Sequence, residues 1–191
     1  MRLASSPLLL LLLLACRPEA PPTTAPTAAL PVRDDAGARA TTVILVRHGE
    51  KASDDPRDPS LSPAGEARAH ALARLLGHAG VTHLFASEYR RTQATLRPLA
   101  DASGHPLVIV PAADGAALLA AIAALPAGAV AAVAGHSNTV PGLVTALGGE
   151  VRGATASPSG PQLPDDAYDR LFVVTVPARG RAGTLELRYG E

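Results

Sequence analysis

The sequence predicts an α/β fold, a single-domain three-layer αβα sandwich with a central, mostly parallel sheet. Short apolar runs alternate along the chain with segments of helical spacing. The first run, 42–46, is β-branched and apolar without polar alternation, which is typical of a strand buried on both faces of a parallel sheet. Two late apolar runs flank a glycine-containing turn and predict a closing hairpin.

The first helix is predicted over 63–79. Ser62 is a suitable N-cap, Pro63 fits the first helical position, and Gly80 ends the periodic segment. The pattern then repeats, with strands predicted over 82–86, 107–110 and 129–134 and helices over 90–102 and 116–125. We place the strand over 42–46 at the centre of the sheet.

A last helix is expected after Asn138, which can cap it, with Pro141 in its first turn and Gly148 at its end. The hairpin strands are predicted over 171–176 and 184–188. The intervening stretch 154–166 is rich in Pro, Ser and Gly without periodicity, so we expect a surface loop that borders the site.

The amino-terminal segment has the composition of an export signal. Residues 1–15 combine Arg2, a leucine-rich run and a small residue before Cys16. The apolar run is much shorter than the ~20 residues that a membrane-spanning helix needs. A permanent transmembrane helix is therefore the weaker interpretation. The stretch 16–40 is rich in Pro, Ala and Thr and predicts a tether, which leaves 41–191 as the folded domain.

Composition excludes several other classes. Lys and Arg total 17 and balance 17 Asp and Glu, and aromatic residues make up 3% of the chain, so nothing predicts binding to nucleic acid. Cys16 is the only cysteine, which leaves the predicted domain without a disulfide or a thiolate nucleophile.

Polar residues that can carry chemistry follow three of the predicted strands. Arg47 and His48 follow the first strand, Ser87 and Arg91 follow the second, and His136 follows the strand at 129–134. Ligand sites of open α/β sheets form at the carboxyl ends of strands, so these residues can converge on one pocket.

The residue types in this pocket suit a phosphoryl group. Arg47 and Arg91 form a predicted clamp, because a guanidinium donates two parallel hydrogen bonds to phosphate oxygens and stays charged. An imidazole attacks phosphorus only when it is neutral and its other nitrogen is held as an N–H donor, usually to a backbone carbonyl. Gly49 beside His48 allows such a close approach of the backbone.

Four segments resemble the histidine phosphatase superfamily, in its phosphoglycerate mutase-like branch and its small phosphatase type. They occur in the family's order and together cover roughly 42–149. They are Arg47-His48-Gly49-Glu50, Leu61-Ser62-Pro63-Ala64-Gly65, Ser87-Glu88-Tyr89-Arg90-Arg91-Thr92 and Gly135-His136-Ser137.

This resemblance implies a mechanism without a metal or an organic cofactor. His48 attacks the phosphoryl group, a phosphohistidine forms and water hydrolyses it, while Arg47, Arg91 and His136 stabilise the transferred charge. Gly49, Glu50 and Ser87 are expected to contribute to substrate binding.

The proton donor is less clearly marked. Phosphoglycerate mutase-like members supply a glutamate between the second arginine and the second histidine, where this chain has only Asp101 and Asp114. We prefer Asp114, because it follows the third strand, whereas Asp101 falls inside a helix. The acid phosphatase branch places an aspartate after its second histidine, and Ser137 here separates the chain from that branch.

Other candidates have simpler interpretations. Glu50 either pairs with Lys51 or helps to orient His48. Ser87 lacks a nucleophile elbow and is expected to position Arg91 or the phosphate. A metal is not expected, because the acidic residues around Tyr168 are best explained as a solvated face. We expect the remaining histidines, His70, His78, His83 and His105, to be surface or boundary residues.

The sequence therefore predicts a histidine acid-type phosphatase, a phosphoric monoester hydrolase that acts on a small phosphorylated substrate or a phosphoprotein. Residues Leu13 to Cys16 resemble a bacterial lipobox, which implies an extracytoplasmic protein anchored to a membrane through lipidated Cys16. A phosphoglycerate mutase and a non-catalytic lipoprotein that binds a phosphorylated ligand are the alternatives.

Overall fold

The computed structural model describes residues 39–190. The predicted signal peptide, Cys16 and nearly all of the predicted tether lie outside the described residues. Within 39–190, no helix combines the length and the apolar character needed to cross a membrane.

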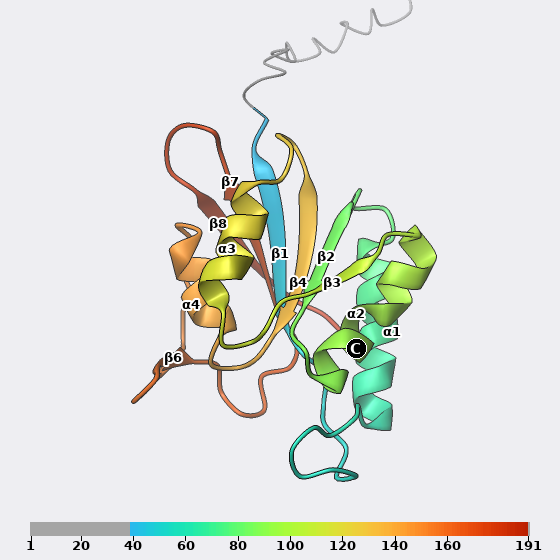
Figure 1. The fold of residues 1–191 in the computed structure, drawn as a ribbon. Coiled ribbons are helices and arrows are strands. Elements are labelled where there is room, and N and C mark those ends of the chain that lie inside the picture. Colours follow the sequence, from blue (N-terminus) through green and yellow to red (C-terminus); the bar gives the residue numbers. More distant parts are fainter. Residues whose placement is uncertain (1–38, 191) are drawn as a thin grey trace, which may run out of the picture. The chain divides into compact units, whose positions relative to one another are not determined.

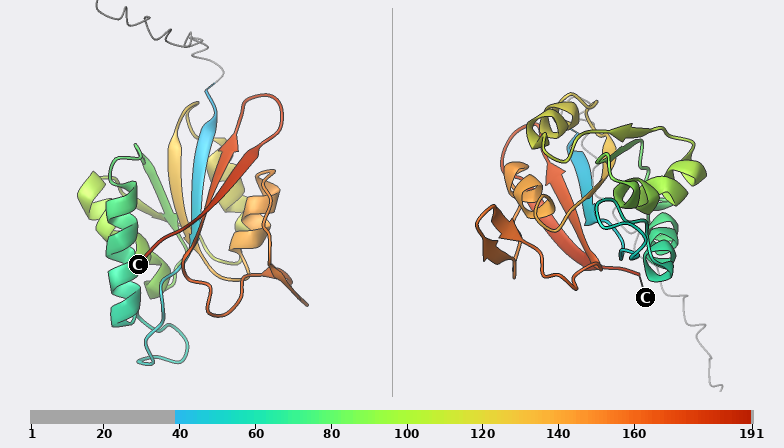
Figure 2. Two further views of the ribbon diagram at one scale, coloured as in Figure 1. Left: turned by 180° about the vertical axis from the view of Figure 1, so that it is seen from behind. Right: turned by 60° about the horizontal axis from the view of Figure 1, so that its bottom comes forward.

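A six-stranded sheet forms the centre of the domain, in the order β3-β2-β4-β1-β7-β8 (Figure 1). The first four strands in this order are parallel, and β7 runs antiparallel to both β1 and β8. Viewed from behind, β7 and β8 lie on one side of β1, and β4 and β2 lie on the other side (Figure 2). The strands are β1 (Thr41–Arg47), β2 (His83–Ala86), β3 (Leu107–Ile109), β4 (Val130–Gly135), β7 (Arg170–Val176) and β8 (Gly183–Arg188).

Helices cover both faces of this sheet, which confirms the predicted three-layer α/β sandwich. One face packs against α1 (Pro63–Leu76) and α2 (Arg90–Ser103), and the other packs against α3 (Gly115–Ala123) and α4 (Val140–Ala146). Strand β1, which was predicted to be central, contributes to the cores on both faces. Val43 and Leu45 of β1 enter one hydrophobic core and Ile44 and Val46 enter the other, and all four are at most 4% exposed.

Local details differ from the prediction at three places. Helix α1 ends at Leu76 rather than at 79, and a turn leads to Gly80, whose φ is 69°. The predicted cap Asn138 is wrong, because Thr139 is the N-cap of α4 and its hydroxyl instead accepts the backbone N–H of His136. The predicted loop 154–166 contains a two-stranded hairpin, β5 (Thr155–Ser157) and β6 (Gly160–Gln162).

Strand register determines where the chemistry lies. Arg47 pairs with Gly135 across β1 and β4, and Ala86 of β2 pairs with Ala134 of β4. His48, Ser87 and His136, which follow these paired positions, therefore lie close to one another at the carboxyl ends of the strands. The backbone N–H of His48 continues the ladder by donating to the Gly135 carbonyl at 2.9 Å.

Candidate functional site

Two buried histidines meet at the carboxyl ends of β1 and β4. The rings of His48 and His136 lie edge to face, with centroids 5.3 Å apart, and the residues are 4% and 8% exposed. The Nδ1 atom of His48 lies 2.7 Å from the Gly49 carbonyl oxygen. A carbonyl can only accept, so Nδ1 carries the proton and Nε2 keeps its lone pair. The backbone therefore favours the tautomer that a nucleophilic histidine needs.

Two neighbours favour the opposite tautomer for His136. Its Nε2 lies 2.9 Å from the hydroxyl oxygen of Ser87, and its Nδ1 lies 3.5 Å from Nη2 of Arg91. The guanidinium can only donate, so Nδ1 of His136 accepts and Nε2 donates to Ser87. Thr92 lies 2.8 Å from the same hydroxyl of Ser87. The structure thus directs Ser87 toward positioning His136.

Both histidines are neutral at ordinary pH. Burial lowers the pKa of His48 to about 3, and the neighbouring cationic side chains add to this effect, while the hydrogen bond to Gly49 acts in the opposite direction. Burial, reinforced by Arg91, lowers the pKa of His136 to about 4. A neutral imidazole at position 48 is the form that can attack phosphorus.

These pKa values predict a pH dependence of stability. An unfolded histidine has a pKa near 6.5. Between about pH 6.5 and about pH 4 the unfolded chain binds protons that folded His48 and His136 do not, so the free energy of unfolding should fall as the pH is lowered. Denaturant unfolding at several pH values checks this. A His48→Asn, His136→Asn double variant should flatten the slope and exposed His70→Asn should not; equal slopes in all three proteins would contradict it.

Two arginines flank the histidine pair. Nη1 of Arg47 donates to the carbonyls of Pro164 and Asp165, each at 2.9 Å, and its guanidinium carbon lies 4.0 Å from the centre of the Tyr168 ring. Arg91 contacts Asp58 at 3.4 Å and lies 4.4 Å from the ring of Tyr89. These contacts fix both guanidinium groups beside the histidines.

Each arginine has a buried side-chain donor that no protein group within 39–190 satisfies. Among the described residues, the Nε atoms of Arg47 and Arg91 are buried and have no hydrogen-bond partner. A buried donor without a partner costs free energy, and more so when it is charged. Two guanidinium groups with donors that no described protein group satisfies, placed on either side of the histidines, are what a phosphate clamp requires.

Two glycines hold the nucleophile loop against the start of α1. A Cβ atom on Gly49 would lie 2.9 Å from the carbonyl oxygen of Gly65, and one on Gly65 would collide with the backbone of Glu50. The backbone N–H of Gly49 donates to the hydroxyl of Thr95 on α2 at 2.9 Å. Gly49 and Gly65 are therefore needed for close packing of backbone on backbone.

The acidic residues around the site are occupied. Glu50 accepts hydrogen bonds from Arg68, the shortest at 2.6 Å, so the expected pair with Lys51 is wrong. Burial acts to raise the pKa of Glu50, but these hydrogen bonds lower it overall. Asp114 is the N-cap of α3 and accepts the N–H of Ala117, and Glu88 accepts the N–H of Ala112. Asp114 also lines a cavity that includes Ser87 and His136.

The structure brings together His48, Arg47, Arg91, His136 and Ser87, and it turns Glu50 toward α1. Sequence reasoning did not identify Tyr168, Tyr89 or Asp58. Two of the chain's three tyrosines contact the arginines of the site. Because aromatic residues are scarce in this sequence, each tyrosine near a candidate residue was itself a signal of a role in the site. No group of three or more His, Cys, Asp or Glu within 39–190 has an arrangement that could hold a metal.

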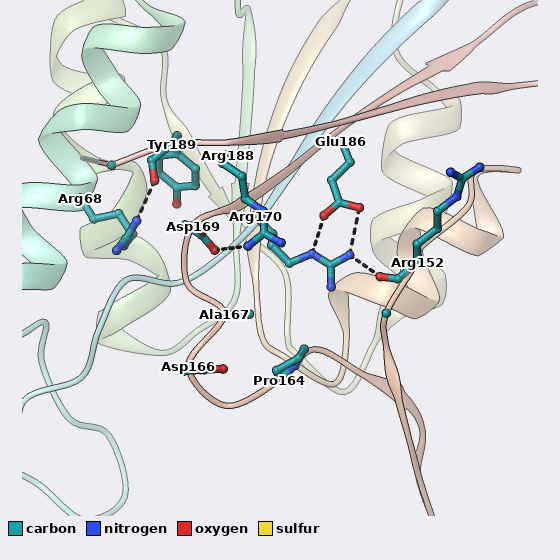
Figure 3. Close-up of a pocket in the computed structure, with 12 residues that line it drawn as sticks. Arg68, Arg152, Pro164, Asp166, Ala167, Asp169, Arg170, Glu186, Arg188 and Tyr189 are labelled. Atoms are coloured by element: carbon teal, nitrogen blue, oxygen red, sulfur yellow. Dashed lines mark hydrogen bonds and ion pairs between the residues drawn. The ribbon is translucent and has the colours of Figure 1, made fainter.

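Figure 3 shows the residues that line a second, polar cavity, whose volume is about 1040 Å³. The segment 164–169 separates this cavity from the histidine pocket, because its carbonyls hold Arg47 while Pro164, Asp166 and Asp169 line the cavity. Its arginines have acidic partners: Arg170 pairs with Glu186 at 2.6 Å and Arg188 with Asp169 at 2.7 Å. These matched charges make it a weaker phosphate site than the histidine pocket.

Residues 43–114 match the model of the histidine phosphatase superfamily (branch 1). Two curated relatives, each named "Probable phosphoglycerate mutase GpmB", come from Yersinia enterocolitica and from an Enterobacter species. Each is 39% identical over 75 residues, which cover 36% of this chain and 35% of the relative. The chain thus spans about a third of the length of these relatives.

Solved structures with the same fold include phosphatases. The protein histidine phosphatase SixA complexed with tungstate has a TM-score of 0.59 at 21% identity, covering 77% of this chain and 96% of that chain. The alpha-ribazole phosphatase from Shigella flexneri has a TM-score of 0.58 at 12% identity, covering 78% and 96%. At such identities these likenesses establish the fold.

Proposed function

We propose that this chain is a phosphatase of the histidine phosphatase superfamily, whose model residues 43–114 match. It hydrolyses a phosphate monoester or a phosphohistidine through a phosphohistidine intermediate on His48. The observation that carries this proposal is a neutral, buried His48 whose Nδ1 is held by the Gly49 carbonyl, beside two arginines with unpartnered buried donors.

The reaction has two balanced steps. The lone pair on Nε2 of His48 attacks phosphorus, the bond from phosphorus to the leaving group breaks, and the leaving group takes that electron pair. Water then attacks the phosphohistidine, the N–P bond breaks, and inorganic phosphate leaves. Arg47 and Arg91 stabilise the charge on the phosphoryl oxygens in both steps, and His136 holds Arg91 in position.

Leaving groups that need little protonation suit this site. Glu50, Asp58, Glu88 and Asp114 each hold another protein group. Phosphohistidine and aryl phosphates have leaving groups of this kind, whereas alkyl phosphates depend on a general acid. This consideration favours phosphohistidine or an activated ester over a sugar phosphate.

The proposal is tested by measuring release of phosphate from aryl phosphates and from a phosphohistidine substrate by the full chain. Acid quenching during turnover with a labelled substrate should trap an acid-labile phosphoenzyme. Label that moves to an added alcohol rather than to water would favour the mutase, the name that the curated relatives carry. Tight binding of phosphate without turnover of any substrate would favour the phospholigand-binding lipoprotein.

We propose Asp114 as the proton donor where the leaving group needs one. It lines the cavity shared with Ser87 and His136. An Asp114→Asn variant keeps an oxygen that can cap α3, so the fold should persist. We expect kcat/KM to fall about a hundredfold or more for an alkyl phosphate and only a few-fold for an aryl phosphate with a good leaving group. Equal losses on both substrates would rule out this role.

We also propose that Cys16 carries a lipid that anchors the protein outside the cytoplasm. The support is the sequence that precedes Cys16. In a bacterial host, Cys16→Ala should move the protein from the membrane fraction to the soluble fraction, because several acyl chains together give firm attachment. Ser6→Ala is a matched control that leaves the cysteine in place. Unchanged retention of the Cys16→Ala protein in membranes would disprove the anchor.

A further inference from the structure

An apolar cavity of about 250 Å³ adjoins His136, one of the two histidines of the site. It lies between the carboxyl ends of β2 and β4 and the helices α3 and α4, and Ser87 and His136 form part of its lining. Most of the remaining wall is hydrocarbon, from Phe85, Val110, Leu118, Leu119, Val133 and Leu143. The polar cavity of Figure 3 has no such wall.

Two glycines contribute to the space in this cavity. A Cβ atom on Gly115, the first residue of α3, would meet only a methyl carbon of Leu143, at 4.0 Å, and one on Gly142 of α4 would meet nothing within 4 Å. Neither glycine has a positive φ. Glycine weakens a helix relative to alanine, and close packing requires it at neither position. What these glycines do provide is room beside His136.

We propose that this cavity receives the leaving group of the substrate, and that this group is a compact apolar ring. This inference rests on the proposed phosphatase function, because it places the phosphoryl group at His48 and the leaving group on the side of His136. An apolar cavity of about 150 Å³ is enough for benzene, so this one accommodates a ring with a short substituent.

The chemistry of the wall selects against polyols. The hydroxyl groups of a sugar or a glycerate would lose their hydrogen bonds to water against Phe85, Leu118 and Val133 and gain few in return. An aryl or alkyl group loses nothing of this kind and gains from leaving water. Asp114, the proposed acid, also lines this cavity, so it belongs to the wall that faces the leaving group.

Binding of non-hydrolysable analogues tests the inference without turnover. We expect calorimetry on the full chain to show that phenylphosphonate binds about tenfold or more tightly than methylphosphonate. Inorganic phosphate should displace both ligands. Gly115→Leu fills the cavity and should remove the preference for the phenyl group while binding of methylphosphonate stays within about twofold. Ala123→Leu, on the exposed side of α3, is the matched control and should keep the preference.

A second cavity-filling variant guards against misfolding. Gly142→Leu replaces a different helical glycine and should reproduce the effect of Gly115→Leu with an unchanged or raised Tm. Equal affinities of the wild-type protein for the two phosphonates, or a phenyl preference that survives both variants, would overturn the inference and leave the phosphatase proposal intact. Failure of both phosphonates and of inorganic phosphate to bind would overturn both proposals together.

Discussion

Replacement of His48 by alanine should lower kcat/KM by about four orders of magnitude or more, with both aryl phosphates and phosphohistidine, because no covalent intermediate can form. His48 is the residue whose Nε2 lone pair is left available by the bond from Nδ1 to the Gly49 carbonyl. The alanine side chain removes the attacking atom and leaves the arginines in place. Residual activity should come from binding and charge stabilisation alone.

Three measurements make this expectation specific. The acid-labile phosphoenzyme should disappear in His48→Ala, while inorganic phosphate still binds. Circular dichroism and Tm should show a folded protein, because burial already keeps His48 neutral and no charge loses its partner. His70→Ala, on the exposed side of α1, is the matched control and should keep full activity. A His48→Ala protein that still formed a phosphohistidine would place the nucleophile elsewhere.

Replacement of Arg91 by alanine should lower kcat/KM by about a hundred- to a thousandfold, the cost typical of losing one donor that stabilises transition-state charge. Arg91 contacts Nδ1 of His136 at 3.5 Å and keeps a buried Nε without a partner among the described residues. Its loss therefore removes a phosphate donor and loosens His136. Most of the loss should appear in kcat.

The neighbouring arginine provides a matched control. Arg90 has a side chain that is 56% exposed and pairs only loosely with Asp54, at 3.5 Å. Arg90→Ala should change kcat/KM by less than about threefold. Arg91→Lys should recover part of the activity, since it restores the charge without the planar fork of donors. Equal effects of Arg90→Ala and Arg91→Ala would show that a general positive potential, rather than a specific clamp, assists the reaction.

The sequence could predict most of the fold because its elements depend on local and periodic signals. The apolar run of β1, the Ser62 cap and Pro63 of α1, and the alternation of strands with helices are all visible without tertiary contacts. The prediction was wrong where a distant partner decides the outcome. Thr139 rather than Asn138 is the N-cap residue of α4, and its hydroxyl accepts the backbone N–H of His136.

The candidate residues themselves were also visible, because each follows a strand whose carboxyl end could be predicted. Their protonation states and hydrogen-bond partners could not be predicted from the sequence. The neutral form of His48 arises from burial by residues of several elements, and the pairing of Glu50 with Arg68 joins positions that are 18 residues apart. Tyr168 stacks on Arg47 across 121 positions of sequence, and no periodicity reports such a contact.

The sequence by itself determined the layers of the fold, the order of its elements and the identity of the polar residues at the strand ends. These follow from side-chain type and spacing, which act locally. Only the tertiary structure decided which nitrogen of each histidine is free, which arginine donors lack partners and where an apolar cavity adjoins them. Burial, tautomer and empty volume depend on atoms that converge from distant parts of the chain, so no local pattern specifies them.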